Sequence, residues 1–126
     1  MLLLDTCTFI WLASDPSRIS AEATRAIDDA SDVYLSDVSV WEIALKWQSK
    51  KIVLPALPRT WVEDQVRAWQ LRRRSIGREE LYRTTELADI HRDPFDRLLV
   101  AQALVEGFRI VTPDPAIRQY PVTVVW

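Results

Sequence analysis

The sequence contains very few of the residues on which several kinds of active site depend. It has one cysteine, Cys7, and one histidine, His91. An internal disulfide and a cysteine-rich zinc site are therefore excluded, and a multi-histidine zinc centre or a Ser-His-Asp hydrolase is disfavoured. Any metal chemistry has to rest on carboxylates, which favour hard cations such as magnesium or manganese.

Long apolar runs, glycine-rich linkers, internal repeats and low-complexity stretches are also absent. The longest apolar run is about six residues, against the roughly 20 that span a bilayer, so we expect no association with a membrane. The start, Met1-Leu2-Leu3-Leu4-Asp5, has no basic segment, which argues against a signal peptide. The 126 residues are 48% hydrophobic and 27% charged, a composition typical of a globular protein. We therefore predict one domain covering residues 1–126 and a cytoplasmic location.

Acidic and basic residues are unevenly distributed, although the net charge is only −2. Residues 1–45 contain eight acidic and two basic side chains, whereas residues 46–97 contain twelve basic and eight acidic ones. This asymmetry is compatible with a cation-binding cleft flanked by a surface that attracts phosphates. Uneven solvent-facing charge is the simpler explanation, and both interpretations stay open at this point.

Short apolar segments alternate with segments of helical periodicity along the chain. Strands are predicted at residues 2–5, 33–35, 109–112 and 122–125, with a short edge strand at 75–77. Helices are predicted at residues 9–12, 20–30, 38–50, 60–74, 79–89 and 94–106. Asn-Gly and Asp-Gly hairpin signals are absent. The pattern predicts an α/β fold whose central, mostly parallel sheet of about four to five strands is flanked by helices.

Four acids occupy positions that meet at one edge of such a sheet. Asp5 ends the first strand and Asp114 follows a later one, while Glu42 and Asp96 lie in the first turns of two predicted helices. Ligands of open parallel sheets bind at the carboxyl ends of the strands, so these side chains are expected to converge. Carboxylates packed together raise one another's pKa values, and one or two divalent cations remove that penalty. Such cations activate water for the hydrolysis of a phosphodiester.

Each acid also has a purely structural explanation. Asp5 is placed to cap the helix that follows it, and Ser39-Val40-Trp41-Glu42 matches the Ser-x-x-Glu capping box. Asp93 is the expected N-cap of the helix at 94–106, which leaves Asp96 where the helix dipole favours an anion. Asp114 lies between two prolines, in a turn where aspartate is common. Only the joint placement of the acids favours catalysis.

Other polar and aromatic residues have two open interpretations as well. His91 is expected to be a hydrogen-bonded structural residue rather than a phosphate ligand, and Cys7 a small core residue rather than a nucleophile. Arg72-Arg73-Arg74 is expected to be a solvated helix end, with contact to a phosphate backbone as the alternative. Three of the six tryptophans are candidates for anchoring a partner protein: Trp47, Trp61 and Trp69.

Four stretches of the chain carry a resemblance to a known family. They are Leu3–Thr6, Ser36–Lys46, His91–Ala103 and Ile110–Asp114. The third stretch opens with His-Arg-Asp-Pro-Phe-Asp-Arg, a specific signal, whereas the Asp-Thr pair of the first would be weak alone. In this order and spacing the stretches resemble the PIN-domain ribonucleases, and more closely the VapC toxins of bacterial toxin–antitoxin pairs.

The resemblance implies a fold, a reaction and a set of site residues. It implies an α/β sandwich that binds Mg²⁺ or Mn²⁺ and cuts single-stranded RNA, forms a homodimer and is inhibited by a cognate antitoxin protein. The metal-site acids implied are Asp5, Glu42, Asp96 and Asp114. The supporting residues are Asp93, Thr112, Ser39 and Arg97.

We therefore predict a metal-dependent endoribonuclease toxin. In this prediction Asp5 and Asp96 ligate the main cation, and Asp114 completes the site or holds a second ion. Glu42 ligates a cation or orients the attacking water. Arg97 approaches the RNA phosphates. One alternative is a PIN-like module that binds RNA or a partner protein without cutting. A more distant one is an α/β phosphoryl-transfer receiver or phosphatase, which normally has adjacent acids after its first strand, where this chain has Thr6 after Asp5.

Overall fold

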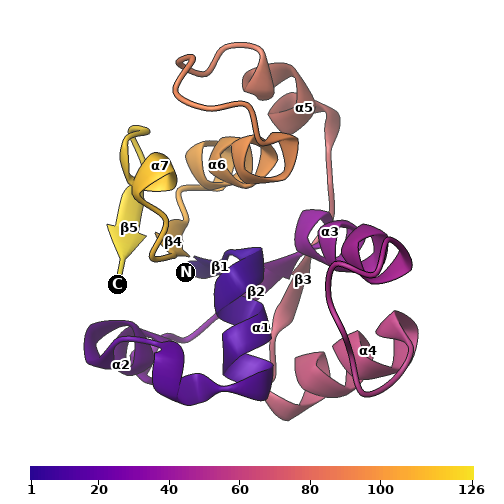
Figure 1. Cartoon of the computed structure of the whole chain (residues 1–126). Helices are drawn as coiled ribbons and strands as arrows, with labels where there is room; N and C mark the ends of the chain where they lie inside the picture. The colour runs from indigo at the N-terminus through magenta and orange to yellow at the C-terminus, as the bar shows by residue number, and fades with distance from the viewer.

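Five short strands form the central layer of the structure (Figure 1). The computed structural model describes the whole chain, Met1–Trp126. The strands are β1 (Leu2–Leu4), β2 (Val33–Ser36), β3 (Arg72–Arg74), β4 (Arg109–Val111) and β5 (Thr123–Val125). Their order in the sheet is β3-β2-β1-β4-β5, and every neighbouring pair is parallel. The predicted α/β class is confirmed, with a sheet that is parallel throughout.

Helices cover both faces of this sheet. They are α1 (Thr6–Ser14), α2 (Ala21–Asp29), α3 (Asp37–Gln48), α4 (Pro58–Ala68), α5 (Arg78–Thr84), α6 (Pro94–Glu106) and α7 (Pro115–Arg118), with a 3₁₀ turn η1 at Pro16–Arg18. In Figure 1, α1, α2 and α4 lie on one side of the sheet and α5, α6 and α7 on the other. No helix combines the length and the apolar composition needed to cross a membrane.

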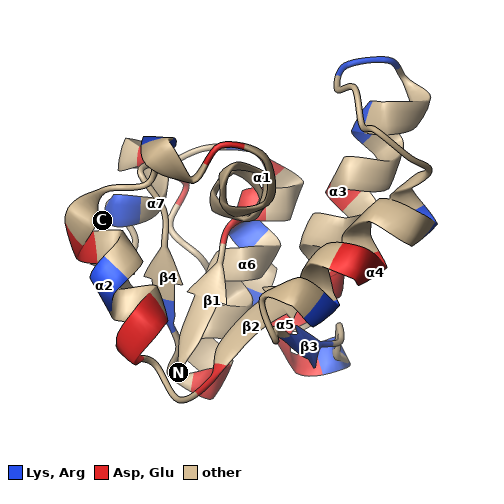
Figure 2. Cartoon of the chain, turned by 90° about the horizontal axis from the view of Figure 1, so that it is seen from below, with Lys and Arg blue, Asp and Glu red and all other residues tan.

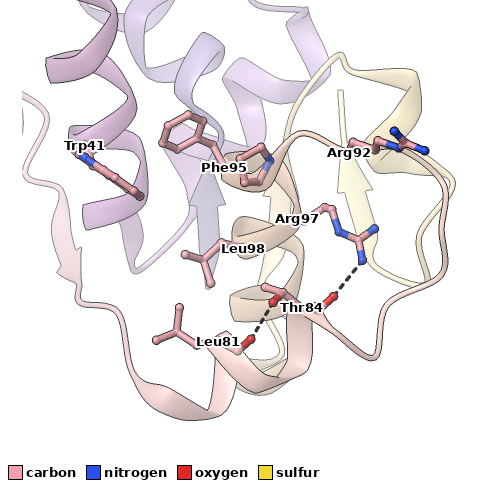
Figure 3. A pocket seen from close by; sticks show the side chains of 8 residues that line it. Trp41, Leu81, Thr84, Arg92, Phe95, Arg97 and Leu98 are labelled. Atoms are coloured by element: carbon pink, nitrogen blue, oxygen red, sulfur yellow. Dashed lines mark hydrogen bonds between the residues drawn. The ribbon is translucent and has the colours of Figure 1, made fainter.

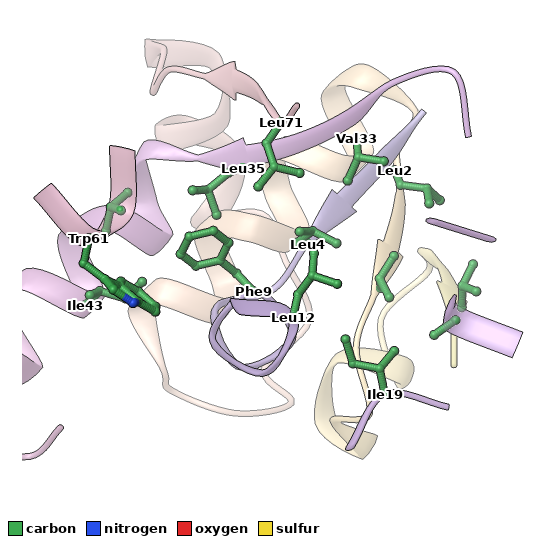
Figure 4. Packing of buried hydrophobic residues seen from close by; sticks show 14 residues of the cluster. Leu2, Leu4, Phe9, Leu12, Ile19, Val33, Leu35, Ile43, Trp61 and Leu71 are labelled. Atoms are coloured by element: carbon green, nitrogen blue, oxygen red, sulfur yellow. The ribbon is translucent and has the colours of Figure 1, made fainter. Parts of the chain in front are cut away.

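The sheet separates two apolar cores. Alternate residues of β1 point to opposite faces, so Leu2 and Leu4 join the core under α1, α2 and α4, whereas Leu3 joins the core under α6. In the first core (Figure 4) Phe9 packs edge to face on Trp61, with 5.7 Å between the ring centroids. Burial of each large side chain contributes roughly 1.5–3 kcal/mol to stability. Trp61 is only 6% exposed, so its predicted role as a partner anchor is wrong.

Helix α6 begins and ends where the sequence predicts. The Asp93 side chain accepts hydrogen bonds from the backbone N–H groups of Phe95 (2.9 Å) and Asp96 (3.2 Å). Pro94 occupies the first helical position, where its missing N–H costs nothing. At the other end Gly107 adopts a left-handed conformation with φ of 75°, which residues with a side chain rarely adopt. This helix carries Asp96 in its first turn.

The predicted helix at 60–74 is wrong in its second half. Helix α4 ends at Ala68, Gln70 has φ of 53°, and residues 72–74 form the edge strand β3 beside β2. Arginine has good intrinsic helix propensity, but here the backbone pairs with Tyr34–Ser36 instead. The predicted edge strand at 75–77 is therefore wrong too, and the helix predicted at 79–89 is the shorter α5.

The predicted capping box at Ser39 is also wrong. Helix α3 begins at Asp37, and its N-cap is Ser36, whose hydroxyl accepts the N–H of Val38 at 3.1 Å. Ser39 lies inside the helix and is buried. This earlier start follows from β2, which runs directly into α3 without a loop.

Candidate functional site

The four predicted carboxylates and a fifth, Asp93, line one open cleft of about 480 Å³. The remaining lining residues are Thr6, Cys7, Ile10, Lys46, Ile52, Pro113 and Pro115. The cleft lies at the carboxyl edge of the sheet, where β1 and β4 end side by side, and Figure 2 shows an acidic segment at the head of the β1 arrow. Asp5, Glu42, Asp96 and Asp114 thus line the same cleft, at the edge of the sheet where the sequence places them. Their catalytic role is a separate matter.

Asp5 connects the cleft to the structure beneath it. Its side chain is the N-cap of α1, accepting the Thr8 N–H at 2.7 Å, and its second oxygen accepts the hydroxyl of Thr112. Asp5 is only 4% exposed, and burial raises the pKa of its carboxyl more than these hydrogen bonds lower it. Asp5 therefore both caps α1 and lines the cleft, so its structural and functional interpretations do not exclude each other.

Thr112 links two of the cleft acids. Its hydroxyl donates to Asp5 and accepts the backbone N–H of Asp114 at 3.0 Å. Asp114 is in turn the N-cap of α7, accepting the Ala116 N–H at 2.9 Å. The predicted supporting role of Thr112 thus has a geometric basis, because its one hydroxyl bonds the side chain of one acid and the backbone of another.

Glu42 is buried, at 5% exposure, and both of its carboxylate oxygens have partners. The Thr6 hydroxyl donates to one oxygen at 2.6 Å, and the Lys46 ammonium lies 2.6 Å from the other. The hydrogen bond to Glu42 raises the pKa of Lys46. Ser39 supports this arrangement indirectly, since its hydroxyl lies 3.0 Å from that of Thr6.

Asp96 has a strongly perturbed carboxyl group. Burial, and then the charges of Asp93, Asp114 and the other cleft acids, raise its pKa to about 8. Its one hydrogen-bonding side-chain partner is His91, whose Nε2 lies 3.3 Å from Oδ2 of Asp96. The other ring nitrogen of His91 is hydrogen-bonded to the Tyr120 hydroxyl at 2.7 Å, so His91 is held in place as the sequence predicts.

Two residues lie differently from what the sequence suggests. Arg97 does not line the cleft: its guanidinium donates to the carbonyls of Thr84 (2.8 Å), Ala88 (2.9 Å) and His91 (3.2 Å). It therefore ties the segment after α5 to α6, and its predicted contact with RNA phosphates finds no support.

Cys7 lines the cleft although we predicted a core residue. Burial, followed by the charge of Asp5, raises the pKa of its thiol to about 12, so the thiol stays protonated.

Thr6 and Lys46 lie in the family stretches Leu3–Thr6 and Ser36–Lys46, but the sequence predicts no role in the site for either residue. Both contact Glu42 and both line the cleft. The signal for Lys46 is its helical spacing of four residues from Glu42. No comparable signal exists for Thr6, because its contact to Glu42 spans 36 residues and depends on the packing of α1 against α3.

The donor set fits a hard divalent cation in its chemistry. Five carboxylates face one cleft, no imidazole lines it, and its one thiol is protonated. The raised pKa values of Asp5 and Asp96 reflect burial and mutual repulsion, which a bound cation would relieve. No three of these side chains are gathered tightly enough to enclose a cation as they stand, so binding requires them to turn inward.

The pKa of Asp96 predicts how stability depends on pH in the absence of metal. Because the folded value is about 8 and the unfolded value 3.8, the folded protein has to hold a proton that the unfolded chain releases. Stability from this group therefore falls as pH rises from about 4 to about 8. Asp96→Asn removes the charge, so we expect its Tm in EDTA to exceed that of the wild type by about 5 °C at pH 8 and to match it at pH 4. Thermal unfolding across this range measures the difference, and equal Tm values at pH 8 would contradict the prediction.

The fold and the acidic cleft are those of a known protein family. Residues 2–122 match the PIN domain family, and the chain belongs to that family. Over 130 aligned residues the chain is 29% identical to Ribonuclease VapC22 of Mycobacterium tuberculosis, an alignment that covers 98% of this chain and 97% of the relative. The resemblance to VapC proteins is thereby confirmed.

Solved structures agree on the fold. A chain in the DNA-bound VapBC structure from Salmonella typhimurium superposes with a TM-score of 0.71 at 18% identity, covering 98% of this chain and 95% of that one. A chain of Rickettsia felis VapBC2, bound to a DNA fragment from its promoter, gives 0.70 at 12% identity, with coverage of 98% and 96%. At these identities the likeness establishes the arrangement of helices and strands alone.

Proposed function

We propose that this protein is a metal-dependent endoribonuclease that acts as the toxin of a toxin–antitoxin pair. The observation that carries the proposal is the convergence of Asp5, Glu42, Asp96 and Asp114 in one cleft of a PIN domain. The name of the M. tuberculosis relative, Ribonuclease VapC22, supports the reaction class. Cellular RNA is the substrate we expect, and the cytoplasm is where that substrate is found.

The carboxylates of the cleft have different proposed roles. Asp5, Asp96 and Asp114 would hold Mg²⁺ or Mn²⁺, which when bound lowers the pKa of water and neutralises charge on a phosphodiester. Glu42 is placed to ligate a cation or to orient the attacking water. Thr112 fixes the positions of Asp5 and Asp114 relative to each other, because its hydroxyl hydrogen-bonds the side chain of Asp5 and the backbone of Asp114. Asp93 adds negative charge to the cleft while capping α6.

The partners follow from relatives and from one apolar surface. Structural relatives were solved as VapBC or FitAB complexes, and we propose a cognate antitoxin for this chain on that ground.

A second, more apolar pocket of about 390 Å³ lies between α3, α5 and α6 (Figure 3). Trp41, 55% exposed, contacts Phe95 edge to face there, and Leu81, 46% exposed, extends the surface. Leu98 also lines the pocket but is buried. Such a surface suits the interface of a homodimer.

An RNA cleavage assay tests the proposal directly. We expect the purified chain to cut a single-stranded RNA oligonucleotide in Mg²⁺ or Mn²⁺ and to leave it intact in EDTA, with activity restored when the cation is added back. Addition of the cognate antitoxin should abolish the cleavage. Retention of RNA without cutting in every cation tested would favour the alternative, a PIN-like binding module.

A further inference from the structure

Lys46 is the one positively charged side chain among the residues that line the acidic cleft. It lies one helical turn after Glu42 on α3, with its Nζ 2.6 Å from a Glu42 oxygen, and its side chain is 43% exposed. The carboxylate of Glu42, by contrast, belongs to a residue that is 5% exposed. Lys46 therefore reaches from the solvent at the mouth of the cleft to a carboxylate inside it.

This contact competes with any cation that Glu42 would ligate. The Thr6 hydroxyl takes one oxygen of Glu42 and Lys46 takes the other. A divalent cation bound among the carboxylates would also repel the ammonium group across a partly desolvated cleft. Occupation of the cleft and the Lys46–Glu42 ion pair are thus mutually unfavourable.

A displaced Lys46 has one suitable new partner. Apart from Asp93, which caps α6, the other charged groups of the cleft are the carboxylates proposed to hold the cation, so the freed ammonium is left to a substrate phosphate at the cleft mouth. A lysine ammonium is a point charge on a flexible stem, which suits a group that changes partners. The long side chain is already partly in solvent and can move without disturbing the core.

We infer that Lys46 is a positioning residue that holds Glu42 while the cleft contains no cation and turns to an RNA phosphate when it does. This inference rests on the proposed function. It makes a distinctive prediction, because the same side chain opposes cation binding and promotes substrate binding. A residue with a purely structural role in supporting Glu42 would promote both.

Two measurements on Lys46→Met test the inference. In the absence of RNA, Mn²⁺ affinity measured by titration calorimetry or by the EPR signal of free Mn²⁺ should increase by about 3- to 10-fold, since a repelling charge is lost. In cleavage of a single-stranded RNA oligonucleotide at saturating Mg²⁺, KM should rise by about 5- to 10-fold with little change in kcat. The slope of log KM against log salt concentration should fall by about 0.7, the value for one phosphate contact on a single strand.

Two control variants separate charge from position. Lys46→Arg keeps the charge and should retain a KM near that of the wild type. Lys51→Met removes an exposed lysine that does not line the cleft, and should leave Mn²⁺ affinity unchanged. Unchanged Mn²⁺ affinity and KM in Lys46→Met would overturn the inference, as would weakened Mn²⁺ binding together with a lower kcat. A wild-type protein that neither binds Mn²⁺ nor cuts RNA would instead overturn the proposed function itself.

Discussion

Asp96→Asn is expected to abolish metal-dependent RNA cleavage, with a loss of at least about 10²–10³-fold in kcat/KM, as when one charge-stabilising group is removed from a preorganised site. The reason is that Asp96 is one of the carboxylates that line the cleft, and the charges of four other acids raise its pKa. Asparagine has nearly the same size, and the one side-chain hydrogen-bond partner of Asp96 is His91, at 3.3 Å. The substitution therefore removes charge without removing packing.

Stability and activity should move in opposite directions in this variant. The same substitution relieves repulsion in the metal-free cleft, so the inactive protein should be the more stable one at pH 8. A matched control is Asp37→Asn, which also removes an acid from the first turn of a helix but lies outside the cleft, paired with Arg73 at 2.8 Å. It should cleave RNA at the wild-type rate. Full activity in Asp96→Asn would remove Asp96 from the catalytic site.

Asp5→Asn should also abolish cleavage, but it is a less selective test. Asp5 accepts the Thr112 hydroxyl and caps α1 in addition to lining the cleft. An amide in its place retains an acceptor for the Thr8 N–H yet cannot accept on both sides. A loss of activity there combines lost charge with a disturbed hydrogen-bond network, which is why Asp96 gives the sharper result.

Glu80→Leu is expected to cause the largest loss of stability that we predict, about 2–4 kcal/mol, because it breaks a buried ion pair. Glu80 is 2% exposed and accepts the backbone N–H of Gly77 at 2.6 Å, and Nη1 of Arg74 lies 3.1 Å away. Burial by itself would raise the pKa of Glu80, but these hydrogen bonds and the charge of Arg74 outweigh it and lower the pKa. Leucine leaves the mostly buried Arg74 with Glu106, at 3.1 Å, as its one acidic partner.

Thermal unfolding measures this loss, and a fall in Tm of roughly 10 °C is the expected size. Glu80→Gln keeps an acceptor for the Gly77 N–H without the charge, so it should lose about half as much. Glu79→Leu changes the neighbouring, exposed acid of the same helix and should stay within about 0.5 kcal/mol of the wild type. An equal Tm for Glu80→Leu and the wild type would mean that the ion pair contributes no net stability.

The parts of the fold that the sequence predicts well are those that local chemistry determines. Helix α6 has a capping aspartate, a proline at its first position and a glycine at its end, and the predicted range 94–106 agrees with the structure. The arginines of β3 carry no such local signal. They form a strand because the backbone pairs with β2, and the charges of Asp32 and Asp37 lie within reach of Arg72 (2.7 Å) and Arg73 (2.8 Å). Contacts between distant segments of this kind have no periodicity in the sequence.

The residues of the candidate site can also be divided into those that the sequence predicts and those that depend on contacts between distant segments. The cleft acids are predictable because strand ends and helix starts in a parallel sheet share an edge, and family motifs mark the same positions. Arg97 shows where that logic stops: its donors satisfy carbonyls of an irregular segment between α5 and α6, whose path no motif encodes. The spacing of Lys46 from Glu42 indicates a helical ion pair, and only the lining of the cleft reveals that Lys46 is the one positively charged side chain there.

The position of β1 at the centre of the sheet has a consequence during synthesis. Asp5 is synthesised well before Thr112, whose hydroxyl it accepts and which lies 107 positions later in the sequence. β1 cannot align with β4 before residues 109–111 have emerged. The cleft that Asp5 and Asp114 share therefore cannot form until β4 has been synthesised and has paired with β1.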